Sequence, residues 1–308
     1  MPLFVNDHFE FAEMNIRHTK SVDKTMSMVR RAIKMGYDSI VINTDIGALS
    51  PDFGDRGCES LSKKMRKRLK RQNIIPDPVV IDTSALDTSW LEANGKHLRL
   101  FSRLTVTISD SSEVHSLKSD PQVQKYDLIA VRPADEQILQ IFSKKGEFID
   151  IITYDQASRS VNWLNKSKII QLCINDGITF EITYGEALKD SSTRREVLKN
   201  GRLLIRSTKN GDGVVIASGA EAMIDIRAPY DAANMLVLFG VRPENARKFI
   251  SSNAKKALLR SETRNTVKGS VLASRVQKMP ENLSTRLNSL QKIKRIPEFC
   301  TELKIVNQ

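Results

Sequence analysis

The sequence predicts an α/β protein: a closed, parallel β/α barrel surrounded by its helices and followed by a flexible, basic C-terminal tail. Two observations point to this fold. Six or seven short apolar segments alternate with amphipathic stretches over about 260 residues, which is typical of a parallel sheet covered by helices. Barrels of this kind run to about 250 residues, and closing the sheet removes its exposed edges. An open, doubly wound sheet is the alternative.

The first predicted elements are a helix and a strand near the N-terminus. The helix begins after Ser21, a good N-cap residue, and ends near Gly36, because apolar residues between them recur at the spacing of one helical face. Those residues are Val22, Met26, Val29 and Ile33. The strand spans 39–43, where a short apolar run bounded by polar residues indicates burial on both faces.

Strands and helices continue to about residue 265. Further strands are predicted at 79–81, 103–108, 128–131, 148–152, 178–182 and 213–216. C-terminal helices are predicted at 191–209, capped by Asp190, then at 230–239, and at 244–260 behind Pro243. We therefore expect a barrel domain over residues 1–265. The tail over 266–308 is expected to be poorly structured or to bind a partner, with a helix near 283–293.

The composition points to a polyanionic partner. Forty-eight Lys and Arg residues against 36 Asp and Glu give a net charge of +12 and a pI near 9.6, which favours nucleic acid. No apolar run approaches the roughly 18 residues of a membrane span, and no secretory signal pattern opens the sequence. We expect the protein in the cytosol or nucleus. The three cysteines form no C-x-x-C pair and are interpreted as small buried residues.

The most informative positive charge lies on the helix predicted at 191–209. Its cations recur at the spacing of one helical face and form a ridge about 21 Å long. They are Arg195, Lys199, Arg202, Arg206 and Lys209, with Glu196 expected off the ridge and Val197, Leu198, Gly201, Leu204 and Ile205 on the opposite side. Like charges in a row repel one another, and RNA phosphates would relieve that repulsion. A merely solubilising face is the alternative.

Two other basic segments are less specific. The run Lys63 to Arg71 holds seven cations in nine residues and is explained equally well as an RNA contact, a solvated helix face or a nuclear-import signal. The helix at 244–260 repeats the ridge more weakly, with Arg247, Lys248 and Lys255 on one side and Arg260 and Arg264 beyond them. Aromatic residues do not interleave with these clusters, so we expect recognition of the RNA backbone and shape rather than base stacking there.

A metal-dependent phosphoesterase is the rival hypothesis. Such a site needs converging His, Asp and Glu ligands, but the four histidines form no H-x-H or H-x-x-H pair, and His97 and His115 fall in predicted polar turns. Candidate ligands are Asp7, His8, Asp82 and Glu181. Ser218-Gly219-Ala220 follows a predicted strand and could hold a phosphate on its N–H groups. A protein scaffold whose basic ridges meet acidic neighbours is the third hypothesis.

Several blocks of sequence resemble the thirty-kilodalton protein subunit family of ribonuclease P and ribonuclease MRP. The most distinctive is the segment 177–184 with its sequence GITFEITY, followed by 187–190 and by Arg194-Arg195. Other blocks agree in the same order, at 102–105, 126–131, 216–220, 226–227, 229–231 and 236–240. The resemblance covers roughly residues 3 to 265, and the segment 4–8 corresponds loosely to the family's usual first strand.

The resemblance implies a TIM-barrel-like fold of the polymerase-and-histidinol-phosphatase (PHP) type without its metal-ligand histidines. It implies no cofactor and no catalysis by the chain itself, because RNA is the catalyst in this family. Expected partners are the catalytic RNA, a small ferredoxin-like protein subunit and other protein subunits of a particle that processes precursor tRNA and rRNA. The particle is expected in the nucleus, within the nucleolus. Direct contact with precursor tRNA is also considered, and no membrane contact is expected. The family's basic motif falls on Lys189, Arg194 and Arg195, where the ridge begins.

Overall fold

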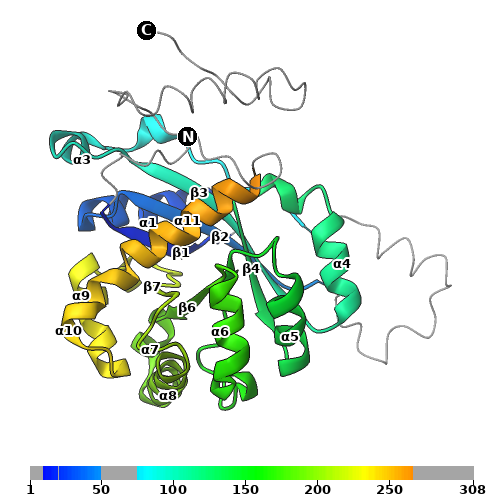
Figure 1. The fold of residues 1–308 in the computed structure, drawn as a ribbon. Coiled ribbons are helices and arrows are strands. Elements are labelled where there is room, and N and C mark those ends of the chain that lie inside the picture. The colour runs from blue at the N-terminus through cyan, green and yellow to red at the C-terminus, as the bar shows by residue number, and fades with distance from the viewer. Residues whose placement is uncertain (1–9, 20, 50–74, 266–308) are drawn as a thin grey trace, which may run out of the picture.

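Seven parallel strands form one sheet in the part of the chain that the computed structural model describes, residues 10–19, 21–49 and 75–265. The strands neighbour one another in chain order from β1 to β7. Beyond β7, Ala220 pairs in parallel with Ile16 of β1, and the Arg17 N–H donates to the Ala220 carbonyl at 3.0 Å. These contacts bring the two edges of the sheet together, so the predicted barrel is nearly closed (Figure 1).

The strands and helices have the following bounds. The strands are β1 (Ala12–Arg17), β2 (Ser39–Ala48), β3 (Arg99–Ile108), β4 (Leu128–Pro133), β5 (Ile151–Ile152), β6 (Thr179–Thr183) and β7 (Val214–Ala217). The helices are α1 (Val22–Met35), α3 (Ser89–Ala93), α4 (Ser111–Ser119), α5 (Glu136–Lys145), α6 (Ser167–Asn175), α7 (Gly185–Lys189), α8 (Ser191–Ser207), α9 (Pro229–Met235), α10 (Pro243–Ala246) and α11 (Ser252–Asn265). No helix among these residues is long and apolar enough to span a membrane.

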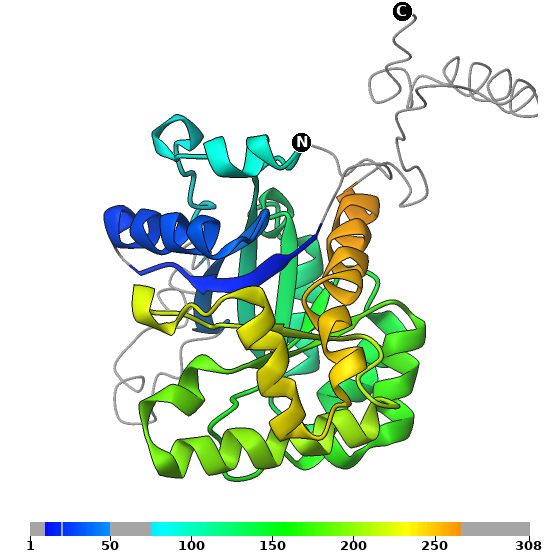
Figure 2. The same cartoon turned by 90° about the vertical axis from the view of Figure 1, so that its left-hand side faces the viewer.

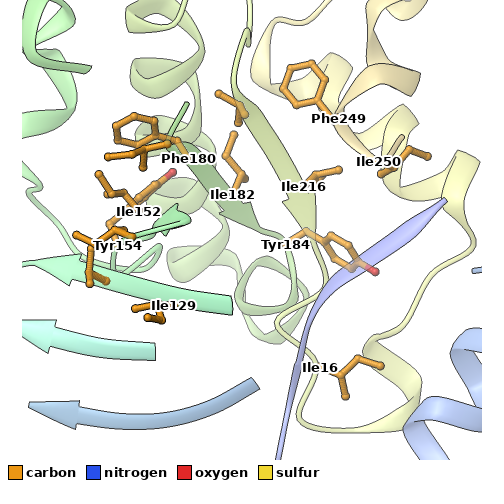
Figure 3. Packing of buried hydrophobic residues seen from close by; sticks show 14 of the residues in the cluster. Ile16, Ile129, Ile152, Tyr154, Phe180, Ile182, Tyr184, Ile216, Phe249 and Ile250 are labelled. Carbon is orange, nitrogen blue, oxygen red and sulfur yellow. The ribbon is translucent and has the colours of Figure 1, made fainter. Parts of the chain in front are cut away.

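Alternation along the strands produces two separate apolar cores. Side chains on the outward sheet face pack against the surrounding helices, as Figure 3 shows for Ile152, Phe180, Ile182 and Ile216. Side chains on the other face fill the barrel, among them Met14 and Phe101. The inner core continues into α11, whose apolar residues belong to the same cluster; they are Ala254, Ala257 and Leu258. Helix α11 therefore crosses the sheet and covers one opening of the barrel (Figure 1).

Local signals predicted α1 correctly. Ser21 caps the helix, with its side chain accepting a hydrogen bond from the Lys24 N–H, and Gly36 ends it in the left-handed conformation. The predicted strand at 39–43 is confirmed and extends to Ala48. Of the strand predicted at 148–152, only Ile151–Ile152 pairs.

Three local predictions were wrong. Residues 79–81 form no strand: Pro76 and Pro78 lie directly before the segment, and Val80 is 87% exposed. The segment 4–8 lies outside the described residues and stays untested, and the first described strand, β1, begins at Ala12. His115 lies in α4, not in a turn. The helix predicted at 244–260 is broken into α10, a 3₁₀ turn at Arg247–Phe249 and α11, so its cations do not share one face.

Candidate nucleic-acid interface

Helix α8 begins and ends within two residues of its predicted bounds. Its N-cap is Asp190, which accepts hydrogen bonds from the N–H groups of Ser192 (2.9 Å) and Thr193 (2.8 Å). These bonds and those from the two hydroxyls favour the charged carboxylate and hold the pKa of Asp190 well below its ordinary value. The helix ends at Ser207, and Lys209 follows in the left-handed conformation with φ of +48°. Lys209 therefore lies off the helix and its ridge.

One side of α8 is packed against the barrel as predicted. Its buried residues are Val197, Asn200, Gly201, Leu204, Ile205 and Ser207. The contact at Gly201 is the tightest, because a Cβ atom there would lie 2.3 Å from the Phe239 ring. Only glycine allows this approach. The contact between Gly201 and Phe239 therefore fixes how α8 packs against the barrel and which side of the helix faces solvent.

The opposite side of α8 presents the predicted cations to solvent. Arg195, Lys199, Arg202 and Arg206 are all exposed. In the described part of the chain, the side chains of Arg195 and Arg206 have no hydrogen-bond or ion-pair partner. Arg202 donates its Nε–H to the Leu238 carbonyl at 2.9 Å, and its terminal guanidinium nitrogens have no partner among the described residues. We name these four residues the α8 ridge.

Lys199 is the member of the α8 ridge with the most internal contacts. Its ammonium donates to the Arg159 carbonyl at 2.7 Å and pairs with Glu196 one turn earlier. The expectation that Glu196 lies off the ridge was therefore wrong, because a residue at i+3 is a neighbour on a helix surface. Both side chains are partly exposed, so the pair contributes little to the free energy of folding. Lys199 can therefore exchange the Glu196 carboxylate for another anion.

Lys189 and Arg194 lie at the junction of α7 and α8. Lys189 pairs with Glu186 at 3.3 Å and with Glu221 at 3.6 Å. Partial desolvation opposes its charge, but these two carboxylates together raise the pKa of Lys189 above its ordinary value. Arg194 donates its Nε–H to the Ala187 carbonyl at 2.8 Å and stays exposed. Both cations adjoin the start of the α8 ridge.

The arginines of α11 have a different environment from the predicted one. Arg260 donates to the carbonyl oxygens of Ile149 (2.9 Å), Gly146 (3.0 Å) and Asp176. Burial lowers the pKa of Arg260. These acceptors lie just before β5 and β6, at the N-terminal ends of the strands.

Arg264 makes a second anchor in the same helix. It pairs with Asp150 at 3.0 Å and donates to the Asp127 carbonyl at 2.7 Å. Burial outweighs this pairing and leaves the pKa of Asp150 raised. Both arginines therefore fasten α11 over the barrel opening. Lys255 is half-buried on the same helix, without such bonds to other described residues.

The barrel interior holds a buried ion pair that sequence reasoning missed. Arg103 and Glu181 form a two-point contact with both side chains fully buried, one N–O distance being 2.7 Å. Asn15 donates to both oxygens of Glu181, and Arg103 also donates to the Met14 carbonyl at 3.0 Å. Along β3 and β6, inward polar positions alternate with outward apolar ones. This alternation was the signal in the sequence that could have revealed the buried pair.

Beside this pair, the Glu13 carboxyl joins β1 to the segment after β7. It accepts hydrogen bonds from the N–H groups of Ser218 (2.9 Å) and Asn15 (3.1 Å). Burial raises the pKa of Glu13 to about 7. The Ser218 N–H is thus occupied and the Ala220 N–H is bonded to the Ser218 hydroxyl, so the phosphate cradle suggested for 218–220 was wrong.

The two candidate metal ligands that the structure describes, Asp82 and Glu181, are both engaged by other groups. Both carboxylate oxygens of Glu181 are occupied by Arg103 and Asn15, which disfavours a cation there. Asp82 is exposed and caps a 3₁₀ turn by accepting from the Ser84 N–H at 2.9 Å. Asp7 and His8 lie outside the described residues, and within those residues no three His, Cys, Asp or Glu side chains gather as a metal site. The run Lys63 to Arg71 and the tail 266–308 also lie outside them.

The carboxyl end of the strands carries charged side chains that were not predicted. Arg17 at the end of β1 pairs with Glu221 at 2.7 Å. Arg132 of β4 pairs with Asp45 of β2 at 2.8 Å and donates to the Thr107 hydroxyl at 3.0 Å. Burial opposes ionisation of Asp45, but the Arg132 guanidinium prevails and lowers the pKa of that carboxyl. The charges at this end are therefore largely compensated.

Comparison with known proteins gives concordant matches. Residues 10–266 match the family model described as RNase P subunit p30. The chain is 25% identical over 260 residues to ribonuclease P protein subunit p30 of Mus musculus, covering 84% of this chain and 88% of the mouse protein. It is 33% identical over 168 residues to ribonuclease P/MRP protein subunit RPP1 of Saccharomyces cerevisiae, covering 54% and 56% of the two chains. A chain in the cryo-EM structure of archaeal ribonuclease P with mature tRNA shares the fold, with a TM-score of 0.54, 17% identity, and coverage of 86% of this chain and 100% of that one.

Proposed function

Since this chain belongs to the RNase P subunit p30 family, we propose that it is a noncatalytic, RNA-binding protein subunit of ribonuclease P and ribonuclease MRP. In these particles RNA carries out the cleavage that removes the 5′ leader of precursor tRNA, and the MRP particle processes precursor rRNA. The observation that carries the proposal within the structure is the α8 ridge, four exposed cations on one helical side.

The α8 ridge suits the sugar-phosphate backbone of RNA. Its four cations stand on a side of the helix whose opposite side is buried, so they cannot turn inward. Two of them, Arg195 and Arg206, have no partner within the described residues, and like charges so close together repel. Phosphates would relieve this repulsion and release counterions, which stabilises the complex most at low salt. Lys189 and Arg194 extend the surface, and Lys255 forms a separate, weaker candidate contact.

The buried Arg103–Glu181 pair supports a noncatalytic role. A hydrolytic metal site needs carboxylates that are free to bind a cation, whereas Arg103 neutralises Glu181 inside the barrel. Within the described residues no other cluster of ligands replaces it.

The test is a charge reversal on the α8 ridge. The triple variant R195E/K199E/R202E is compared with K118E/K144E/K145E, which makes the same change of charge on exposed lysines of α4 and α5. The probe is the RNA that copurifies with the chain, identified by sequencing and transcribed in vitro. We expect the ridge variant to bind at least about tenfold more weakly, and each lost phosphate contact to flatten the logarithmic salt slope by about 0.7 to 0.9. Equal losses in both variants would contradict the assignment.

The chain is also expected to have partners other than the catalytic RNA. We propose assembly with a small ferredoxin-like protein subunit and with the other protein subunits of the particle, contact with precursor tRNA, and residence in the nucleus and nucleolus. The support is membership of the family. Mass spectrometry of the purified particle, crosslinking to labelled precursor tRNA and imaging of a fluorescent fusion test these points separately. Crosslinks to proteins alone, with none to RNA, would favour the scaffold hypothesis instead.

A further inference from the structure

A second surface brings aromatic rings and cations together from four separate parts of the chain. The Phe11 ring, just before β1, is buried and contacts Tyr230 of α9 edge to face, with centroids 5.3 Å apart. The Arg247 guanidinium lies 5.5 Å from the Phe11 centroid, and the Lys96 ammonium lies 5.9 Å from it. This surface is on the side of the barrel seen in Figure 2, where α3 in cyan lies above β1 in dark blue and α9 in yellow lies below.

Trp90 of α3 extends this surface past Lys96. The Lys96 ammonium lies 5.9 Å from the Trp90 ring as well as from Phe11, so each pair of neighbours from Trp90 to Tyr230 is less than 6 Å apart. Glu10 pairs with both Lys96 and Arg247, the latter at 3.3 Å, and holds the two cations in place. We name Trp90, Lys96, Phe11, Arg247 and Tyr230 the aromatic surface.

The two outer rings of the aromatic surface are unusually accessible. Trp90 is 55% exposed and Tyr230 is 54% exposed, although rings of this size are normally buried. The inner ring, Phe11, is buried, whereas about half of each outer ring is open to solvent. Exposed aromatic rings beside Lys and Arg are the combination with which proteins bind unpaired bases: the ring stacks on the base, and the cation faces the phosphate.

We infer that the aromatic surface binds single-stranded RNA, with unpaired bases stacked on Trp90 and Tyr230 and a phosphate facing Arg247. The inference rests on the proposed function, since it takes RNA as the ligand. The Arg247 side chain is 58% exposed, so its guanidinium can meet a phosphate of the strand in place of Glu10. This surface is separate in residues and in chemistry from the α8 ridge, which has no aromatic member.

Intrinsic fluorescence can test the stacking directly, because the chain contains only two tryptophans. Trp163 is buried in the apolar core between the sheet and the helices, where it is 1% exposed, whereas Trp90 is open to solvent. The full chain is titrated with a ten-nucleotide single-stranded adenine RNA and, separately, with an RNA duplex of the same length. We expect the single strand to quench the emission of Trp90 and the duplex to leave it nearly unchanged. In the W90F control, which keeps Trp163, the quenching disappears.

Affinity measurements complete the test. Loss of one stacking contact in Y230A should weaken binding of the single strand by about tenfold while leaving the salt slope unchanged. The triple variant of the α8 ridge should still show the quenching at saturation, so failure of the ridge and failure of the aromatic surface are distinguishable. Absence of quenching, or equal quenching by the duplex, would overturn the inference. The inference would also be overturned if, in the assembled particle, a protein subunit covered Trp90 and RNA left the Trp90 emission unquenched.

Discussion

Arg103 and Glu181 face each other inside the barrel from β3 and β6, joined by two hydrogen bonds and wholly removed from solvent. The two residues are separated by 78 positions in the sequence. Neither could remain charged at this depth without the other, because an isolated buried charge is strongly disfavoured. Their pairing therefore requires the barrel to be closed correctly, and it leaves Glu181 without a free oxygen for a metal ion.

Glu181→Gln should destabilise the fold strongly. The substitution leaves the Arg103 guanidinium buried without a counter-charge, and the free energy of unfolding should fall by about 3 to 5 kcal/mol. Urea denaturation measures this change. The control is Glu147→Gln, which removes a solvent-exposed partner of Lys118 and should leave the free energy of unfolding almost unchanged. Equal effects of the two substitutions would show that the buried pair is not required.

Glu13 should make the protein less stable as the pH rises towards neutrality. Its pKa is about 7 in the fold against an ordinary 4.5, so the folded state holds the proton more tightly. The stabilisation is fully present below pH 4.5 and is lost as the pH rises through 7, by about 3 kcal/mol at about 1.4 kcal/mol per pKa unit. Urea denaturation at pH 5 and pH 8 checks it. Glu13→Gln keeps an oxygen for the Ser218 N–H but cannot titrate. If the free energy of unfolding of this variant changed with pH as steeply as that of the unmodified chain, the assignment would be refuted.

Replacing Arg260 and Arg264 by alanine should separate stability from RNA binding. Both side chains fasten α11 to backbone carbonyls and Asp150, so R260A/R264A should lower the free energy of unfolding by about 2 to 4 kcal/mol. The affinity of the remaining folded protein for RNA should not change. Lys256→Ala, at an exposed position of the same helix, is the control for stability. A loss of RNA affinity in the folded double variant, comparable to that of the ridge variant, would return these arginines to the interface.

Gly201→Ala should disturb the packing of α8 against the barrel. The new methyl group would lie 2.3 Å from the Phe239 ring, so either the helix or the ring must move. Overpacking of this kind destabilises by about 1 to 3 kcal/mol, even though alanine favours a helix more than glycine does. In the G201A/F239L background the clash should be relieved, and stability should recover relative to F239L alone. Additive effects of the two substitutions in urea denaturation would show that the residues do not interact.

Much of the fold could be predicted from local signals. The caps Ser21 and Asp190, together with the 3.6-residue spacing, gave the starts of α1 and α8, because capping and helical periodicity involve residues only a few positions apart. The bounds of β5 and the break before α11 could not be predicted in this way. Both depend on where strands pair and where a helix must turn to cross the barrel, which are contacts between distant segments.

By itself, the sequence determined that the chain is a basic α/β protein whose longest predicted helix carries cations on one side. It could not distinguish cations that face solvent from those that anchor the fold. Arg202 and Arg264 look equivalent in the sequence, yet the first lies on the α8 ridge and the second pairs with the buried carboxyl of Asp150, 114 positions away. The tertiary structure decided this, and it also assembled the aromatic surface from residues 11, 90, 96, 230 and 247. The reason is physical: periodicity records the face of one element, whereas burial and ion pairing arise only when distant elements pack together.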